Sequence, residues 1–385
     1  MWFAEVVCAS YILSCASIAV AATVTRGHAD ITFDDFLSMH NKTYPSMDEL
    51  KLREALFDDS RSAVVVQNAK FERGDSMWWA TVNNRSDWTE KERASSRMAP
   101  SRTLRAPQPT NQGTLPQDGQ AKQANPPTAD WMWAQTAVKD QGGCGSCWAF
   151  ATTEVLESYL TIAGGNGSTP LILAPQTLVD CVKNPNACGG TGGCEGATAE
   201  IAFNYTRDNG IALERQLPYT HKDGACPSYT AAVKNGGYVT LAQNSASALE
   251  TALARNGPVA ITVAANWDNY GGGIFEGGCK MPILWKTDVC NLDHAVVAVG
   301  YTSDYWLVRN SWGGDWGERG YIRLTRKNDN ATFRDEQTNE GVACRPYPKY
   351  QYPMGESGCL FDMSYPTGVR KVSLNEDPPR TLNQP

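Results

Sequence analysis

Contrasting stretches of apolar and polar residues divide the chain into regions. Residues 6–22 are apolar almost without interruption. Residues 98–127 are rich in Pro, Gln, Ser, Thr and Asn and hold almost no aromatic residues. Such a composition cannot bury a core, so the second stretch predicts an exposed linker between an N-terminal and a larger C-terminal region.

The strongest helical pattern before the linker runs from Glu49 to Asn68. Six residues in this stretch are spaced three or four positions apart and therefore share one helical face: Glu49, Arg53, Phe57, Ser60, Val64 and Asn68. Glu49 and Arg53 can also form an ion pair at i, i+4. Periodicity alone predicts an amphipathic helix here.

Beyond the linker, helical patterns come first and strand patterns follow. A helix is predicted from Cys147 to about Ala163, ended by Gly164 and Gly165, with a buried stripe of Ala149, Leu156, Leu160 and Ala163. A second helix is predicted over 197–209. Short strands are predicted at 259–263, in the segment DHAVVAVGY that contains His294, at 305–308 and at 321–324.

Composition narrows the function classes. The 385 residues allow two or three domains, or one large domain with processing segments. Charged residues make up 19% and the net charge is -7, so the chain lacks the basic character that nucleic acid binding requires. We expect no nucleic acid partner.

The apolar N-terminus predicts an export signal. Small residues at Ala19 and Ala21 form a signal peptidase pattern, although the segment before them contains Glu5 and no Lys or Arg. A membrane anchor is the alternative, but the apolar run is short for a span. Five glycosylation sequons agree with export: Asn41, Asn84, Asn166, Asn204 and Asn330. The ten cysteines after the signal are therefore expected to form disulfides by default.

The segment QGGCGSCWAF contains the first candidate chemistry. Cys144 and Cys147 fit three interpretations: a metal clip, a redox pair, or a bridge partner beside a nucleophile. No second Cys-x-x-Cys is present, which weakens the metal interpretation. Cys147 begins the predicted helix, where free amides and the helix dipole favour a thiolate. Cys144 is better placed for a bridge.

A thiolate nucleophile needs a proton partner and a group that orients it. The chain has four histidines, and His294 is the one placed beside an apolar strand after the linker, whereas His221 lies in a polar loop. Asn310 follows the strand at 305–308, and its amide oxygen can accept the imidazole proton. Trp312 could cover that bond. The structural alternatives are a core histidine and a turn asparagine.

Three segments carry a family resemblance: QGGCGSCWAF, LDHAVVAVGY and YWLVRNSWGGDWGERGYIRL. They resemble the papain-like cysteine proteases, nearest the cathepsin L type, over most of residues 130–366. The resemblance implies that Cys147 is the nucleophile, His294 the acid/base, Asn310 the orienting amide, and Gln141 an oxyanion-hole donor. It implies no cofactor and no metal.

The upstream helix resembles the family's inhibitory pro-region. Glu49, Arg53, Phe57 and Asn68 match its pattern, while Ser60 and Val64 replace the expected Asn and Ile. In a later motif Asn83 and Asp87 match, but Thr81 and Arg85 stand where Gly and Phe are expected. The resemblance implies a small helical domain that threads backwards through the cleft.

The resemblance also implies disulfides. It suggests the bridge Cys181–Cys226. Cys144 is expected to pair with Cys194; the alternative partner is Cys188, which keeps part of the family's spacing. We expect Cys279–Cys359, and place Cys290 with Cys344, leaving Cys188 free or paired elsewhere.

Substrate-binding residues follow from the same alignment. Gly196 and Ala197 stand where relatives hold the substrate backbone with two glycines. The side-chain pocket is expected to involve Thr262, Leu292, Asp293 and Ala295, with Trp312 beside His294. This favours an apolar or aromatic substrate residue; the alternative places Asp362 at the pocket floor, where it would admit a basic one. The insert before His294, 280–289, could overhang the cleft.

The implied fold is α+β and two-lobed, with a helical left lobe, a β-barrel-like right lobe and a helical propeptide. We expect a signal peptide at 1–21, a propeptide at 22–97, a linker with the maturation site at 98–124 and a peptidase domain at 125–385. Within that domain the left lobe covers about 125–234, the right lobe about 235–366, and a polar tail 367–385.

The expected function is that of a cysteine endopeptidase that is made as a zymogen and is secreted or lysosomal/vacuolar. We expect a monomer that is inhibited by its own propeptide. Its expected substrates are proteins and peptides, and we expect no membrane association after the signal peptide is removed. Alternatives are an exopeptidase or transpeptidase on the same scaffold, a catalytically silent binding homologue, and a redox protein.

Overall fold

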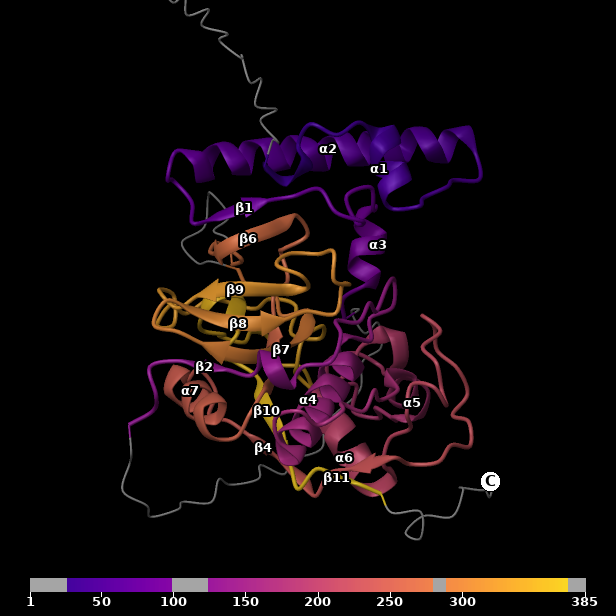
Figure 1. Ribbon diagram of the computed structural model, residues 1–385, viewed down its shortest axis with the longest axis vertical. Coiled ribbons are helices and arrows are strands. Elements are labelled where there is room, and N and C mark those ends of the chain that lie inside the picture. The colour runs from indigo at the N-terminus through magenta and orange to yellow at the C-terminus, as the bar shows by residue number, and fades with distance from the viewer. Residues whose placement is uncertain (1–25, 99–123, 280–288, 373–385) are drawn as a thin grey trace, which may run out of the picture.

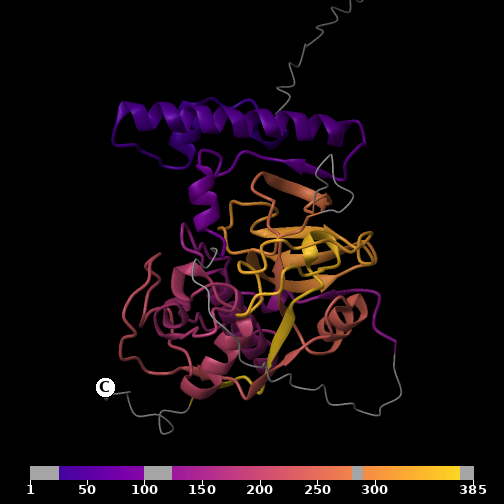
Figure 2. The same ribbon diagram turned by 180° about the vertical axis from the view of Figure 1, so that it is seen from behind.

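The computed structural model describes residues 26–98, 124–279 and 289–372. The predicted signal peptide, nearly all of the linker, the insert at 280–288 and the last residues of the tail lie outside these ranges. Residues 26–98, here called the N-terminal module, lie across one end of a larger body built by the rest of the chain (Figures 1 and 2). In the described ranges, no helix has both the length and the apolar character that a bilayer span requires.

The N-terminal module is mainly helical. Its elements are η1 (Arg26–His28), α1 (Phe33–Met39), α2 (Met47–Glu72), β1 (Trp78–Ala80) and α3 (Glu90–Ser95). Helix α2 confirms the predicted helix and begins after Ser46, whose hydroxyl accepts a hydrogen bond from the Glu49 amide at 3.2 Å. Phe57 and Val64 from its buried face pack with Phe36. Val64 thus fills the position where the family pattern has Ile.

The left lobe holds the other long helix. Its elements are η2 (Met132–Ala134), α4 (Cys147–Gly164), α5 (Pro175–Cys181), η3 (Gly193–Glu195), α6 (Ala199–Asn209) and β3 (Val233–Lys234). Helix α4 begins at Cys147, as predicted, but its burial is not confined to one stripe. Every residue from Cys147 to Ser158 is buried, whereas Ala163, predicted to be buried, is exposed. The first turns of α4 lie between the lobes and touch neighbours on all sides, while its last turn reaches the surface.

The right lobe is a twisted sheet. Its elements are β2 (Ala129–Asp130), β4 (Gly237–Thr240), α7 (Ala246–Arg255), β5 (Val259–Val263), β6 (Tyr270–Phe275), β7 (His294–Tyr301), β8 (Tyr305–Arg309), β9 (Tyr321–Thr325), η4 (Glu356–Gly358) and β10 (Met363–Thr367). The strand order is β1-β6-β9-β8-β7-β5-β10-β4, with β2 also paired to β7. Strand β7 is buried along its whole length, so His294 begins a strand fixed on both sides.

The N-terminal module contributes β1 to the edge of this sheet. Trp78 pairs with Gly273 on β6, in an antiparallel arrangement. The neighbouring Trp79 indole lies so close to Gly271 that a Cβ added there would come within 2.4 Å of it. Glycine at this position therefore lets the Trp79 ring pack flat against the strand.

Four disulfides are present among the described residues. Cys144–Cys194 and Cys181–Cys226 join the pairs that the resemblance implied. The other two pairs differ from expectation, because the structure contains Cys188–Cys344 and Cys279–Cys290. Cys359 is a buried free cysteine rather than the partner of Cys279.

The corrected pairing has a physical cause in the segment between β9 and η4. Residues 326–355, here called the strap, cross to the left lobe. The Tyr347 hydroxyl donates to the Ala187 carbonyl at 2.8 Å, and the Arg345 amide donates to the Asn186 carbonyl at 2.9 Å. These bonds place Cys344 beside Cys188, and Cys290 pairs with Cys279 instead.

The start of the predicted polar tail is also more ordered than its composition suggested. Thr367 ends β10, and β11 (Arg370–Lys371) pairs antiparallel with β3 of the left lobe. The segment therefore connects the right-lobe sheet back to the left lobe.

Candidate active site

Cys147 lies at the first position of α4 and is completely buried. A backbone hydrogen bond from Ala295, next to His294 on β7, reaches the Cys147 side chain. Burial raises the pKa of the Cys147 thiol to about 12, and the backbone donors at the helix start only partly oppose it. The sequence predicts a thiolate at this helix start, but burial of Cys147 away from water favours the neutral thiol instead.

His294 and Asn310 are joined directly. The His294 Nε2 atom and the Asn310 Oδ1 atom are 2.8 Å apart, and both residues are fully buried. Among the described residues, His294 Nδ1 has no hydrogen-bond partner. With Nε2 held by the amide, Nδ1 is the ring nitrogen left for a reacting group. Burial lowers the pKa of His294 to about 3, and the Asn310 bond opposes that shift.

Trp312 covers the imidazole, as predicted. Its ring centroid lies 4.9 Å from that of His294, and the indole is itself buried. Asp140 forms an isolated β-bridge with Trp312, which links the loop before Cys144 to the loop after Asn310. The two loops that carry Gln141 and Asn310 are thus held side by side.

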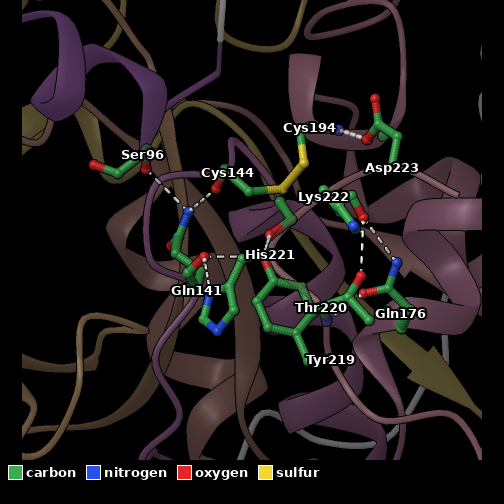
Figure 3. Close-up of a disulfide and its surroundings, with 12 residues drawn as sticks. Ser96, Gln141, Cys144, Gln176, Cys194, Tyr219, Thr220, His221, Lys222 and Asp223 are labelled. Atoms are coloured by element: carbon green, nitrogen blue, oxygen red, sulfur yellow. Dashed lines mark hydrogen bonds between the residues drawn. A yellow bond between two sulfur atoms is a disulfide. The ribbon is translucent and has the colours of Figure 1, made fainter.

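The side-chain amide of Gln141 lies between Ser96 and Cys144 (Figure 3). The Nε2 atom donates to the Cys144 carbonyl and to the Ser96 carbonyl, each at 2.9 Å. Its Oε1 atom accepts a hydrogen bond from the Ser311 hydroxyl at 2.6 Å, which fixes the amide orientation. Ser96 belongs to the N-terminal module, so a module carbonyl occupies a donor that the sequence predicted for an oxyanion hole.

The residues after Ser96 cross the cleft. The Met98 amide donates to the Asp293 carbonyl at 2.7 Å. A Cβ added to Gly145 would come within 2.4 Å of the Arg97 carbonyl, and one added to Gly196 within 2.8 Å of the Met98 side chain. Met98 was predicted to begin the linker, but it is buried in this cleft because it packs on Gly196.

Two groups of ion pairs hold parts of the N-terminal module to one another. Arg53 forms ion pairs with Glu49 at 2.7 Å and with Glu92 at 2.6 Å, which confirms the predicted i, i+4 pair and ties α2 to α3. Buried Asp87 pairs with Lys42 at 2.5 Å and is contacted by the Tyr44 hydroxyl.

The position where the family pattern has Phe behaves differently here. Arg85 is buried, and its guanidinium lies 3.8 Å from the Trp312 ring centroid. It also pairs with Asp268 at 3.3 Å. The departure therefore introduces a buried cation in place of an apolar contact.

The expected pocket residues lie close together in the right lobe. Thr262 on β5 is the register partner of Ala295 on β7, and its hydroxyl donates to the Asp362 carboxyl at 2.8 Å. Leu292 is buried under the strap, since a Cβ on Gly341 would come within 2.6 Å of its Cβ. Ala197 is also fully buried. Burial raises the pKa of Asp362 well above its usual range.

Sequence reasoning missed Asp268 and the strap. Asp268 lies in the turn between β5 and β6, and its position within WDNY resembles an ordinary turn signal. The strap has no apolar periodicity, so in the sequence only Cys344 indicated that this segment is attached to another one. In the described part of the chain, no cluster of three or more His, Cys, Asp or Glu residues could hold a metal ion.

Two family patterns match the chain. The papain family cysteine protease pattern matches residues 125–340, and the cathepsin propeptide inhibitor domain matches residues 33–92. The chain is similar to a cathepsin L-like proteinase of Phaedon cochleariae, with 34% identity over 77% of this chain and 89% of that relative. It is also 34% identical to digestive cysteine proteinase 1 of Homarus americanus, over 78% and 91% respectively.

A solved structure resembles most of the chain. The digestive procathepsin L2 proteinase from Tenebrio molitor larval midgut has a TM-score of 0.69 and 28% sequence identity, covering 87% of this chain and 98% of that one.

Proposed function

Because the chain belongs to the papain family of cysteine proteases, as a cathepsin L-like endopeptidase made as a zymogen, we propose that Cys147 is its nucleophile and His294 its proton partner. The N-terminal module is its inhibitory propeptide. The observation that carries the assignment is the 2.8 Å bond from His294 Nε2 to Asn310, which leaves Nδ1 for the unpaired Cys147 at the start of α4.

The proposed reaction has two halves. His294 takes the proton of the Cys147 thiol as the sulfur attacks the peptide carbonyl carbon, and it passes that proton to the departing amine nitrogen as the C–N bond breaks. A thioester remains on Cys147. Water then gives a proton to His294 and attacks the thioester carbon, which releases the acid and restores the sulfur. Asn310 orients the ring through both steps, and Trp312 excludes water from their bond.

Gln141 supports the negative oxygen that forms in each half. Its Nε2–H and the backbone N–H of Cys147 are proposed to donate to the carbonyl oxygen as charge develops. In the zymogen the Ser96 carbonyl takes the Gln141 donor, so a substrate carbonyl cannot use it. Intramolecular inhibition then follows from occupation of this site by the propeptide backbone.

The pocket that we propose for the substrate side chain includes Thr262, Leu292, Ala295 and Asp362. The raised pKa of buried Asp362 favours its neutral form, hydrogen-bonded to Thr262. A neutral carboxyl gives no strong selection for a basic residue, so we propose an apolar or aromatic preference. Gly196, Ala197 and Asp293 are proposed to border the substrate backbone.

The disulfides and the cathepsin and digestive relatives indicate the secretory pathway. We further propose that the signal peptide is removed, that maturation cuts within residues 99–124, and that the monomeric product works in a lysosome or vacuole or outside the cell. Mass spectrometry of the mature N-terminus tests the cut.

A matched pair of cysteine variants tests the nucleophile. Cys147→Ser and Cys359→Ser each remove a free buried cysteine, and each zymogen is processed in trans by a protease that is then removed. Cys147→Ser is expected to lose hydrolysis of a peptide–dye substrate, whereas Cys359→Ser retains it. Retained turnover by Cys147→Ser would remove the assignment.

A further inference from the structure

Three arginines of the propeptide converge on one carboxylate of the peptidase domain. Arg85, Arg93 and Arg97 lie 3.3, 3.4 and 2.8 Å from the oxygens of Asp268. Burial alone would raise the pKa of Asp268, but the three guanidinium groups outweigh it and hold the pKa below its usual value. In the zymogen this carboxylate is therefore ionised, and its charge is balanced by the three guanidinium groups.

The carboxylate lies next to the catalytic centre. The Arg85 guanidinium that pairs with Asp268 also lies over the Trp312 ring at 3.8 Å, and Trp312 contacts the His294 ring. Asp268 and Trp312 thus hold one guanidinium between them, by an ion pair and a cation–π contact. A second carboxylate, that of Asp293, lies 3.7 Å from Arg97.

The order of contacts along the propeptide shows which end of the cleft this is. Arg85 lies at Trp312, Ser96 at Gln141, and Met98 at Gly196. By the family resemblance, Gly196 is proposed to border the part of the substrate that becomes the acyl group. Asp268 and Trp312 therefore lie at the opposite end, on the His294 side, where the departing amine receives its proton.

Maturation changes the surroundings of Asp268. All three arginines that pair with it belong to the segment that maturation removes. In the described peptidase domain, no lysine or arginine forms an ion pair with Asp268 to replace them. The mature enzyme is left with a carboxylate beside an uncovered indole face, and a lone charge of this kind favours a cationic partner.

We propose that Asp268 and Trp312 form a guanidinium subsite in the mature enzyme, which selects substrates with arginine shortly after the scissile bond. Arginine suits the site better than lysine, because a planar guanidinium can stack on the indole while it pairs with the carboxylate. The propeptide arginines occupy the subsite before maturation. This inference rests on the proposed function of Cys147 and His294.

The test uses mature enzyme and quenched peptides that share one acyl-side sequence. Arginine, alanine or glutamate is placed at the first, second or third position after the scissile bond. At one of these positions the Arg peptide is expected to exceed the Ala peptide in kcat/KM by about tenfold, and the Glu peptide to fall below both. A peptide–dye substrate, which has no residue after the cut, reports the proposed function separately.

Variants at Asp268 connect the preference to the carboxylate. In Asp268→Asn the Arg-to-Ala ratio of kcat/KM is expected to fall toward one, whereas Asp268→Glu retains it. The ratio does not depend on how much of a preparation is folded. Asp304→Asn, on an exposed loop of the same lobe, is expected to keep the wild-type ratio.

Equal rates for Arg and Ala peptides in a wild-type enzyme that hydrolyses the dye substrate would overturn the subsite and leave the proposed function intact. An Arg preference that persists in Asp268→Asn would overturn the role of Asp268.

Discussion

The side-chain amide of Gln141 donates a hydrogen bond to the carbonyl oxygen of Ser96 at 2.9 Å. One residue belongs to the peptidase domain and the other to the propeptide. Under the proposed function, the contact places a backbone carbonyl where a substrate carbonyl would be polarised, and the next residues, through Met98, continue across the cleft. Inhibition and catalysis are therefore predicted to depend on the same donor.

Gln141→Glu in the mature enzyme tests this donor. The variant keeps the shape of the side chain but replaces the donating NH2 group with an oxygen. We expect kcat to fall by about 10²- to 10³-fold with a smaller change in KM, because the donor acts mainly on the developing oxyanion. Steady-state kinetics with a peptide–dye substrate measures it. Ser311→Ala, which removes only the bond that orients the amide, should lose less. An unchanged kcat would contradict the role of Gln141.

Asn310→Ala tests the orientation of His294. Without the 2.8 Å bond the imidazole can rotate and exchange tautomers, so kcat is expected to fall by about a hundredfold. The pH profile of kcat/KM should shift as well, because the amide bond favours the protonated imidazole. Asn256→Ala, at an exposed position in the same lobe, serves as control. A profile that matches the wild type would exclude an orienting role.

Glu92 is predicted to contribute to the pH dependence of maturation. Burial opposes its ionisation, but hydrogen bonds from Arg53 and Thr89 outweigh it and lower the pKa of Glu92 to about 2. The contribution of the Glu92 carboxylate to the stability of the folded propeptide is therefore fully present above about pH 4.5 and is lost as the pH falls toward 2.

The Glu92→Gln zymogen lacks this contribution at every pH. We expect it to mature faster than the wild type at pH 5.5, with a smaller further gain on acidification. Gel analysis of the time course of propeptide loss measures this. Glu54→Gln, at an exposed position on α2, should behave like the wild type. Equal rates for Glu92→Gln and the wild type would contradict the prediction.

The strap is predicted to stabilise the contact between lobes. Removing Cys188–Cys344 with a double Ser variant should lower the free energy of unfolding by about 2–4 kcal/mol, because the bridge closes a long loop. Denaturant unfolding of the zymogen measures the change. A loss below about 0.5 kcal/mol would show that the strap hydrogen bonds hold the segment without the bridge.

Local features of the site were predictable from the sequence. The helix at Cys147 and the strand at His294 follow from apolar periodicity, because each signal lies in consecutive residues. The α2 helix was equally clear. Asn310 was predicted from its place after the strand at 305–308, and the family motif then named Gln141.

Contacts between distant segments were not predictable in this way. The path of the strap decides which cysteine meets Cys188, and that path depends on hydrogen bonds between segments more than a hundred residues apart. Nor did any pattern reveal that Arg85 would meet Asp268, because the two come together only when the propeptide lies in the cleft.

The central claim is that the propeptide holds Cys147 as an unreactive buried thiol and that its removal releases a reactive sulfur. The most direct test is the rate of Cys147 alkylation against pH, followed by mass spectrometry, in zymogen and mature enzyme. Burial raises the thiol pKa to about 12 in the zymogen, so we expect negligible labelling there from pH 4 to 8. The mature enzyme should label rapidly across this range, while buried Cys359 stays unlabelled in both. Equal Cys147 labelling rates in the two forms would contradict the account.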